Sequence, residues 1–424
     1  MRRQPTVNLG NLLLSLSDAM DLASPKLAQH QQRTAFVAWQ IGKIAGLEDL
    51  AIEELFIAAL LHDIGALSVE EKVALRQATI EESEVEDVEG HCIRGETLLE
   101  KVSWLEPAAK IVRFHHRDWT QWDQPIDDPT VLRSQILLLA DYLERLVIRD
   151  RYILHQEEEL VSRVKSMSGN SFHPDVVDCF INAADREEFW LDLVNPRLYS
   201  LLLHQGPYKR LHVDLLGMTS LTELFRNIID FRSRFTATHS AGVAACCVVL
   251  SKIFGLTETE VQLMEIAGNL HDLGKLAIQN SILEKRGKLT KEEFYIIKSH
   301  TYFTYSVLNT IGGLEQISEW SAFHHEKLDG SGYPFHCTAS ALDTGARILA
   351  IADLFVAIAE DRPYRKGMSQ KEITRILKEF SNRQLLDKNI TCLLLDNYDK
   401  INCYVKEVQS SVLDFYKNQF SVPD

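Results

Sequence analysis

The histidines of this chain fall into two sets with the same spacing. Ten of the 15 histidines belong to these sets, and each member of the second set lies 209 residues after its partner in the first. The intervals within each set are 32, 29, 24 and 1 residues. The sets are His30, His62, His91, His115 and His116, and then His239, His271, His300, His324 and His325. This agreement indicates an internal duplication, so we expect both halves to share one fold.

Aspartates accompany both sets. Asp63 and Asp272 each follow the second histidine directly, and Asp141 and Asp353, which are 212 residues apart, each lie in an apolar run with helical character. Five imidazoles and two carboxylates suit iron, manganese, cobalt, nickel or zinc better than magnesium or calcium. Because seven ligands exceed the needs of one ion, we expect two divalent transition metal ions, iron or manganese above all, bridged by Asp272.

Such a pair of ions predicts a reaction. Two metals roughly 3.5–4 Å apart bind a bridging hydroxide and stabilise both the attacking and the leaving oxygen of a phosphoryl displacement. Phosphoester hydrolysis is therefore the expected chemistry. In the second half the expected metal ligands are His239, His271, Asp272, His300, His324, His325 and Asp353.

Helical periodicity dominates both halves, so the expected fold class is all-α, with two tandem helical bundles. Facing helices would carry the histidines and aspartates into a bundle core. Capping boxes in the second half mark helix starts at Thr257-Glu260, Thr290-Glu293 and Ser369-Glu372, and Gly255 and Gly312-Gly313 mark helix ends. The expected helices there are 237–254, 258–272, 290–311, 315–325, 343–360 and 370–381.

Two motifs in the second half resemble those of the HD-GYP family, a branch of the HD phosphohydrolase superfamily. They are His-Asp-Leu-Gly-Lys at 271–275 and His-His-Glu-Lys-Leu-Asp-Gly-Ser-Gly-Tyr-Pro at 324–334, and the likeness covers residues 220–410. The resemblance implies a metal-dependent phosphodiesterase that hydrolyses cyclic di-GMP or 3′3′-cyclic GMP-AMP to a linear dinucleotide. It assigns the seven residues above as metal ligands. The expected domains are a degenerate HD domain (1–195), a connector (196–218) and an HD-GYP catalytic domain (219–424).

The resemblance also implies how the substrate is held. Lys275 would act in catalysis beside Asp272, because a cation next to the metals stabilises a non-bridging phosphate oxygen. These local charges matter in a chain whose formal net charge is −15. The expected substrate-binding residues are Lys275, Gly332, Tyr333, Pro334, Arg347, Arg362 and Arg365.

The second half departs from the family pattern at two places. Family members with three metals have a glutamate four residues before the first histidine, whereas this chain has Phe235 there, so we expect two metals. The segment 335–340 reads Phe-His-Cys-Thr-Ala-Ser in place of the usual stretch with Gly, Leu and Ile-Pro. It would lie near a base, which leaves open the choice between cyclic di-GMP and the mixed dinucleotide.

The first half keeps the ligand types but loses the residues expected to handle phosphate. Lys275 corresponds to Ala66, Arg347 corresponds to Gln135, and Gly-Tyr-Pro is missing from the loop 117–122. We interpret the first half as a degenerate copy: a relic, a structural metal site, or a domain that senses or packs against its partner. A second metal site there would use His30, His62, Asp63, His91, His115, His116 and Asp141.

The bulk composition restricts partners and location. The net charge of −15 argues against nucleic-acid polymers and anionic membranes as partners. The apolar runs are too short for a membrane helix, and the first residues make a poor signal peptide, so we expect a cytoplasmic protein. The seven scattered cysteines should be reduced core residues. The expected partner is the cyclic dinucleotide, and a homodimer is left open.

Two other functions compete with catalysis on a cyclic dinucleotide. One is a non-catalytic receptor that binds the dinucleotide and signals through the N-terminal HD domain, although a receptor has no need of seven ligand residues and Lys275. The other is an HD phosphohydrolase for mononucleotides, against which the Gly-Tyr-Pro motif argues.

Overall fold

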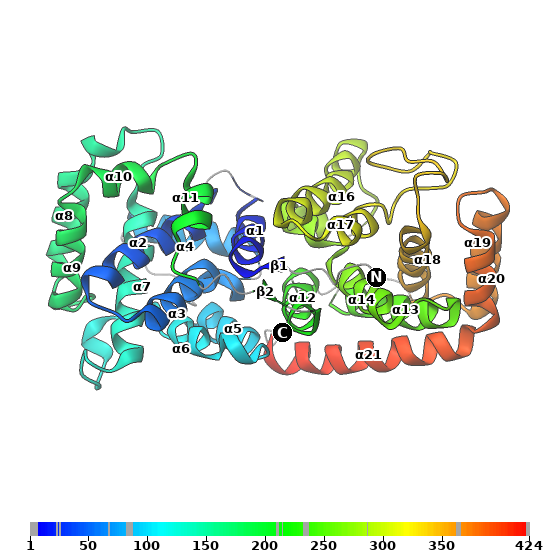
Figure 1. Cartoon of the computed structure of the whole chain (residues 1–424), viewed down its shortest axis with the longest axis horizontal. Helices are drawn as coiled ribbons and strands as arrows, with labels where there is room; N and C mark the ends of the chain where they lie inside the picture. The colour runs from blue at the N-terminus through cyan, green and yellow to red at the C-terminus, as the bar shows by residue number, and fades with distance from the viewer. Residues whose placement is uncertain are drawn as a thin grey trace. The chain divides into compact units, whose positions relative to one another are not determined.

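The computed structural model describes residues 7–22, 24, 27–66, 68–81, 88–208, 212–213, 215–231, 237–285, 287–361 and 366–420. The chain divides into two compact units. The N-terminal unit is Leu9–Leu211, and the C-terminal unit combines Met1–Asn8 with His212–Asp424. Helices make up most of both units, which confirms the all-α prediction (Figure 1).

The N-terminal unit is a bundle in which α2, α3 and α7 carry much of the buried apolar surface. Its long helix α7 begins with Pro129, and the Asp128 carboxylate caps it by accepting the N–H groups of Thr130 and Val131. The elements are α1 (Leu9–Asp21), α2 (His30–Ile44), α3 (Asp49–Leu61), η1 (His62–Gly65), α4 (Val69–Glu81), α5 (Val88–Leu99), η2 (Ser103–Leu105), α6 (Glu106–Arg113), η3 (Trp119–Gln121), α7 (Pro129–Leu146), η4 (Ile153–His155), α8 (Glu157–Ser166), α9 (Pro174–Ala184), α10 (Glu187–Leu193) and α11 (Leu198–Gln205).

The C-terminal unit repeats this helical plan. In the described residues, strand structure is limited to β1 and β2, which pair antiparallel with Val7 opposite Val213. The elements are β1 (Val7–Asn8), β2 (His212–Val213), α12 (Leu215–Phe231), α13 (His239–Phe254), α14 (Glu258–Leu270), η5 (Leu273–Ala277), α15 (Asn280–Leu283), α16 (Lys291–Ile311), α17 (Glu315–Ala322), α18 (Thr344–Ala359), α19 (Gln370–Asn382), α20 (Lys388–Asp396) and α21 (Tyr398–Gln419).

Local sequence signals account for the helix starts of the C-terminal unit. All three expected capping boxes form, at α14, α16 and α19. Gly255 ends α13 in the left-handed conformation, with φ 95°. Two helices end earlier than expected, because α14 stops at Leu270 and α17 at Ala322. The histidines of both motifs therefore lie in turns that follow these helices and not within the helices.

The structure extends the duplication to a pair of buried aspartates. Asp21 and Asp230 are also 209 residues apart, and both are almost fully buried. Asp21 accepts the N–H of Gln31 at 3.1 Å, and Asp230 accepts the N–H of Ser240 at 3.0 Å. Each carboxylate therefore anchors the first turn of the helix that begins with the first histidine of its set.

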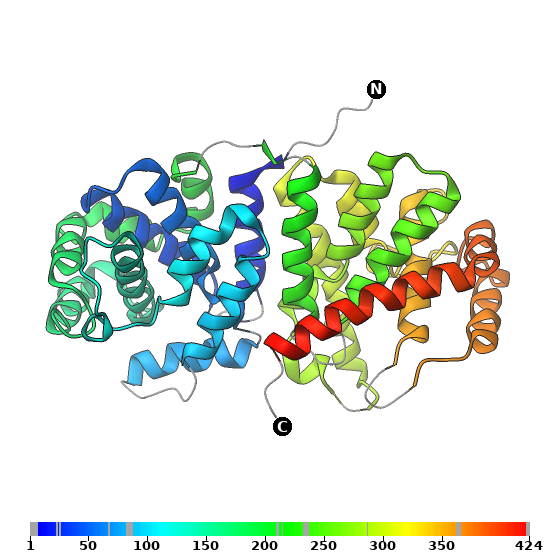
Figure 2. The same ribbon diagram turned by 90° about the horizontal axis from the view of Figure 1, so that it is seen from below.

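The last helix closes the C-terminal unit. α21 lies along α13 in both ribbon views (Figures 1 and 2). Its Gln409 donates to Thr238 O at 3.3 Å and to Glu360 Oε2 at 3.1 Å, next to the start of α13 and the end of α18. α21 therefore braces the two helices that carry His239 and Asp353.

The cysteines differ from expectation. None of the seven, all of which lie in the described residues, forms a disulfide, but only Cys92, Cys246 and Cys247 are buried, whereas Cys392 and Cys403 are exposed on α20 and α21. The expectation that all are core residues is therefore wrong, because the outer faces of these two helices also carry cysteine. In the part of the chain that the structure describes, none of the helices combines the length and the apolar character needed to cross a bilayer.

Candidate metal centre

The C-terminal unit brings together all seven residues expected to bind metal. They come from the start of α13, the turn after α14, the middle of α16, the turn after α17 and the middle of α18. Their ligand atoms form overlapping groups within 4.8 Å: His239 with His271 and Asp353, His271 with Asp272 and His324, and His300 with His324 and His325.

Three of these histidines are held in the tautomer that a metal requires. In each, Nδ1 donates to the carbonyl oxygen three residues earlier, so Nε2 keeps its lone pair for the centre of the cluster. The Nδ1 to oxygen distances are 2.8 Å for His271, 2.6 Å for His300 and 2.6 Å for His324. Within the described residues, the buried His271 Nε2 has no hydrogen-bond partner. A buried nitrogen acceptor without a hydrogen-bond partner is expected where the nitrogen binds a cation.

Asp272 and Asp353 each lie within 4 Å of three histidines. Asp272 Oδ2 lies 3.2 Å from His271 Nε2, and its Oδ1 lies 3.4 Å from His300 Nε2. Asp353 Oδ1 lies 3.1 Å from His239 Nε2. Because the two oxygens of Asp272 face different histidines, this carboxylate is placed between two ligand groups. The donor set and its arrangement fit a pair of transition metal ions.

The electrostatics keep most of the imidazoles neutral. Burial lowers the pKa of His300 to about 3, and burial also holds the pKa of His324 well below its usual value. His239 is the exception. Burial opposes its charge, but Glu360 and Asp353 outweigh burial and raise the pKa of His239 to about 10. Glu360, whose Oε1 lies 3.5 Å from His239 Nδ1, was missed by the sequence reasoning. The sequence clue to Glu360 is its position at the end of the helix that carries Asp353.

Lys275 lies beside the cluster as expected. Its Nζ is 2.6 Å from Asp272 Oδ2, and its side chain is mostly buried. Burial opposes the charge of Lys275, but the adjacent Asp272 carboxylate outweighs burial and raises the lysine pKa. The ammonium group is therefore charged and points at the carboxylate between the two ligand groups.

Gly274 sets the distance between η5 and α16. A Cβ at this position would overlap the His300 carbonyl oxygen and lie 2.8 Å from Thr304 N. The glycine N–H donates to Thr304 Oγ1 at 2.9 Å, and that hydroxyl donates to His271 O at 3.0 Å. The close approach of η5 and α16 therefore fixes the positions of His271 and His300 relative to each other.

Gly274→Ala should destabilise the C-terminal unit by about 1–3 kcal/mol, the usual cost of overpacking, and should lower turnover by displacing His300. Thermal unfolding and steady-state kinetics measure the two effects. Gly65→Ala is the matched control, because a Cβ at Gly65 would overlap His91 O in the N-terminal unit. It should lower thermal stability but spare turnover. Equal loss of turnover in both variants would contradict this assignment.

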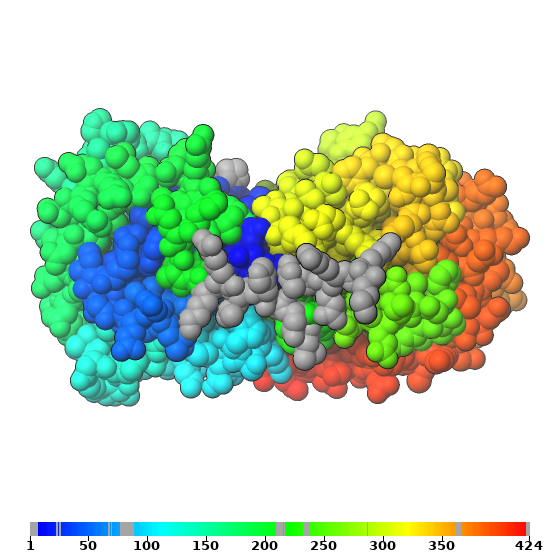
Figure 3. All heavy atoms as spheres, viewed as in Figure 1, coloured from blue at the N-terminus to red at the C-terminus, as the bar shows by residue number. Residues whose placement is uncertain are grey.

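Glu326 organises the loop after the paired histidines. This buried side chain accepts the N–H groups of Phe335 (2.7 Å), His336 (3.1 Å) and Cys337 (3.0 Å). Sequence reasoning quoted Glu326 within a motif but gave it no role. The loop lies on the surface of its unit, in the yellow to orange region (Figure 3). Glu326 therefore holds this loop against the paired histidines that precede it in the sequence.

Gly332, Tyr333 and Pro334, which were expected to bind substrate, lie in this loop. The Tyr333 ring is 5.0 Å from the His325 ring, and the Tyr333-Pro334 peptide is cis. A Cβ at Gly332 would overlap the backbone of Glu326 and lie 2.6 Å from His325 O, so only glycine fits. The motif thus folds its Gly-Tyr-Pro segment back against its own histidine.

Glu326→Ala should release this loop, since three N–H groups lose a charged acceptor and hydrogen bonds to charged groups contribute about 1.5–3 kcal/mol each. We expect faster amide hydrogen exchange over 333–337 and a higher KM, with secondary structure retained. Glu379→Ala removes an exposed glutamate from α19 and should change neither quantity. Unchanged exchange in the Glu326 variant would refute the role of this carboxylate.

Four other positions singled out in the sequence carry less information. Arg347 donates to Leu342 O at 2.8 Å, Ala339 O at 2.6 Å and Asp387 Oδ2 at 2.8 Å, so it ties the loop to α20. Its contact with substrate stays an untested prediction. Arg362, Arg365 and Phe235 lie outside the described residues.

The N-terminal unit gathers its seven counterparts in the same way but pairs them differently. His30 Nδ1 contacts Glu144 Oε2 at 2.5 Å. Arg145 makes a buried, two-pronged ion pair with Asp141, with Nε 2.8 Å from Oδ1 and NH2 2.6 Å from Oδ2. The C-terminal position equivalent to Arg145 is Ala357. Sequence reasoning missed Arg145, although the 212-residue offset points to it.

The N-terminal loop also differs from its counterpart. Arg117, which replaces Glu326, donates to Gln121 O at 3.1 and 2.8 Å and lies 4.7 Å from the Trp122 ring. Gln135, which replaces Arg347, donates to Arg117 O at 2.9 Å. A compact turn therefore stands where the C-terminal unit has its Gly-Tyr-Pro loop.

Comparison with known proteins agrees with this architecture. Two family models, each described as an HD domain, match residues 27–146 and 223–390. The chain is 28% identical over 400 residues to the 3′3′-cGAMP-specific phosphodiesterase 1 of Vibrio cholerae, covering 92% of each protein. It is 37% identical over 143 residues to the cyclic di-GMP phosphodiesterase response regulator RpfG of Xanthomonas campestris, covering 33% of this chain and 37% of that protein.

A solved structure has the same fold. The crystal structure of the cyclic GMP-AMP-specific phosphodiesterase V-cGAP3 from V. cholerae superposes with a TM-score of 0.63 at 21% identity, covering 93% of this chain and 98% of the other. Both halves of the present chain are thus HD domains, and the second carries the complete ligand set, the lysine and the Gly-Tyr-Pro loop. The chain belongs to the HD-GYP family, with two HD domains in tandem.

Proposed function

We propose that the C-terminal site hydrolyses a phosphodiester bond of a cyclic dinucleotide and releases the linear dinucleotide. The observation that carries this proposal is the convergence of five histidines and two aspartates beside the charged Lys275. His239, His271, Asp272, His300, His324, His325 and Asp353 would hold two divalent ions, iron or manganese, which supply Lewis acidity and activate water when bound.

The chain's own residues provide the rest of the chemistry. Lys275 offers a cation beside the ligand cluster, where it would contact a non-bridging phosphate oxygen. Asp272 holds this ammonium in place at 2.6 Å. Tyr333 and its neighbours, held by Glu326, would line the side of the site where a nucleoside lies. Water attacks phosphorus, one ester P–O bond breaks, and the leaving oxygen takes a proton.

Among cyclic dinucleotides we propose 3′3′-cyclic GMP-AMP as the preferred substrate. Two relatives named for this dinucleotide align with both halves of the chain, at 92% and 89% coverage, whereas a third matches 41% of it. Relatives named for cyclic di-GMP match 30–44% of it. The two-domain arrangement therefore supports the mixed dinucleotide. The proposal includes a cytoplasmic location, where the seven free cysteines would stay reduced.

Purified full-length protein loaded with manganese or ferrous iron tests the proposal. It is incubated with 3′3′-cyclic GMP-AMP, cyclic di-GMP or a mononucleotide, and products are separated by chromatography. We expect linear dinucleotide from the mixed substrate at the highest kcat/KM. Faster turnover of cyclic di-GMP would overturn the preference alone. Tight binding without turnover, with metal content verified, would instead establish a receptor, and turnover of mononucleotides alone would establish a general phosphohydrolase.

A further inference from the structure

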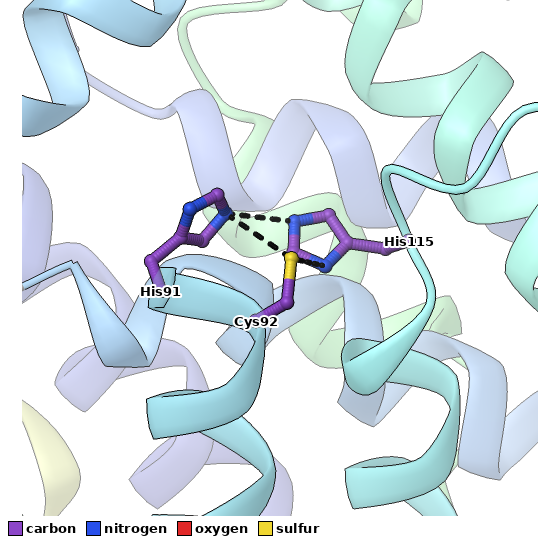
Figure 4. A group of neighbouring side chains, drawn as sticks. All are labelled: His91, Cys92 and His115. Atoms are coloured by element: carbon purple, nitrogen blue, oxygen red, sulfur yellow. Dashed lines mark hydrogen bonds between the residues drawn. The ribbon is translucent and has the colours of Figure 1, made fainter. Parts of the chain in front are cut away.

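The N-terminal cluster differs from the catalytic one at two positions that control metal binding. Arg145 stands where the C-terminal unit has Ala357, and Cys92 stands where it has Thr301. Thr301 turns its hydroxyl to Lys298 O at 2.8 Å, within its own helix. Cys92 instead lies between two histidines (Figure 4).

Arg145 withdraws two of the expected ligands. It neutralises Asp141 through both carboxylate oxygens, with the two side chains 4% and 2% exposed. Its NH2 group also donates to His116 Nε2 at 3.4 Å, which occupies the lone pair that a metal would need. A guanidinium cannot give up its charge, so a metal ion bound by Asp141 and His116 is disfavoured. The fixed cation thus takes the place of one metal ion.

Cys92 completes a different ligand set. His91 Nε2 lies 3.3 Å from His115 Nε2, and Cys92 Sγ lies 3.7 Å from His91 Nε2 and 3.5 Å from His115 Nδ1. The 3.3 and 3.7 Å distances from His91 Nε2 are close to the ligand-to-ligand distances of about 3.3–3.6 Å in tetrahedral zinc sites with nitrogen and sulfur ligands. The 3.5 Å distance shows that Cys92 packs against the His115 ring, because His115 Nδ1 is not the ligating nitrogen. Because His115 Nδ1 donates to Val112 O at 2.6 Å, its Nε2 keeps a free lone pair. All three residues are buried.

Asp63 supplies an independent sign of a missing cation. This buried carboxylate has an oxygen, Oδ1, with no hydrogen-bond partner in the described part of the chain. Oδ1 lies 3.8 Å from His91 Nε2 and 3.6 Å from His62 Nε2. An orphaned carboxylate oxygen is costly in the interior unless a cation binds it. Asp63 Oδ1 would therefore supply a fourth ligand from the side of His91, while Oδ2 of the same carboxylate lies 3.4 Å from His30 Nε2.

We propose that the N-terminal HD domain binds one zinc-class ion through His91, Cys92, His115 and Asp63, and that Arg145 replaces the second ion of the duplicated site. Four protein ligands close the coordination sphere and leave no position for water, which is the pattern of a structural site. The thiolate favours zinc over the manganese or iron proposed for the other half. The N-terminal HD domain would thus have lost catalysis and would be stabilised by a bound metal ion. This proposal holds whichever substrate the C-terminal site hydrolyses.

Cobalt(II) substitution of the full-length chain tests the thiolate ligand. Chelator-treated protein titrated with cobalt(II) should show a sulfur-to-cobalt charge-transfer band in the near ultraviolet. Cys92→Thr installs the residue of the equivalent C-terminal position and should abolish the band. Cys403→Ser removes an exposed cysteine and should leave it unchanged. A band that is absent from the wild type, or that persists in Cys92→Thr, overturns the proposal.

Metal stoichiometry tests the role of Arg145. In a His271→Ala background, which disables the C-terminal site, zinc should raise the thermal unfolding temperature, and the sulfur-containing N-terminal site should take up one equivalent. Arg145→Ala should allow one further equivalent, because Ala is the residue in the metal-binding copy. Unchanged uptake in that variant overturns the replacement. Zinc X-ray absorption without a sulfur shell overturns the ligand set even where Cys92→Thr fails to fold.

Discussion

Asp272→Asn should reduce hydrolysis of the cyclic dinucleotide by on the order of 10⁴-fold, the scale of loss when one member of a catalytic set that acts as a unit is removed. The two carboxylate oxygens face His271 Nε2 and His300 Nε2 at 3.2 and 3.4 Å, and one also holds Lys275. An amide keeps the shape but loses the charge that would join two cations. Steady-state kinetics with metal analysis of the same preparation measures the loss.

The internal duplication supplies the control. Asp63→Asn makes the same change in the N-terminal HD domain, and it should leave a substantial part of the turnover. Circular dichroism establishes that both variants are folded. Comparable losses in the two variants would mean that catalysis depends on both HD domains, which would contradict a single working site. The pair His271→Ala and His62→Ala extends the comparison to a ligand that carries no charge.

Lys275→Met should lower kcat by about 10²–10³-fold, the cost of losing one group that stabilises charge in a phosphoryl transition state. Methionine retains most of the side-chain volume but no charge, and the equivalent N-terminal residue, Ala66, also has none. Because Lys275 is not among the seven expected ligands, metal content at saturating metal should stay close to that of the wild type. Single-turnover kinetics isolates the chemical step from product release.

An exposed lysine provides the comparison for this variant. Lys288→Met removes the same charge from a surface position between α15 and α16 and should leave kcat unchanged. A fall in kcat of the same size in both variants would indicate a general effect of net charge. Loss of metal from Lys275→Met would show instead that the lysine maintains Asp272, and its role toward the phosphate would then be wrong.

Much of the catalytic half followed from sequence alone, because its signals are local or periodic. The capping boxes at Thr257, Thr290 and Ser369 act within one helical turn, and each formed as expected. The 209-residue offset paired the histidines without reference to any fold. The ends of α14 and α17 were predicted too late. The apolar periodicity continues past both ends, but the close packing contact at Gly274 and the turn after Ala322 end these helices.

Glu360 and Glu326, to which sequence reasoning gave no role, act through contacts that only the folded chain makes. Glu360 acts on His239 from 121 positions away along the chain. Glu326 was in view, but its three N–H partners become visible only when the loop folds back. Arg347 was expected to bind substrate, which stays a prediction, and its contact with Asp387 becomes visible only in the fold. Charge and residue type are readable in a sequence, whereas the partner that neutralises a charge is chosen by packing.

The two HD domains share their ligand residue types but differ in the contacts that those residues make. The ligand types could be predicted from the sequence, because the same seven positions recur in both halves, and so could the restriction of Lys275 and Gly-Tyr-Pro to one half. Which N-terminal ligands keep a lone pair for a metal depends on contacts that form when the chain folds. Arg145 lies one helical turn from Asp141 and pairs with it, and helix packing brings His91 and Cys92 to His115. A buried ligand is available to a metal only when no other group already satisfies it.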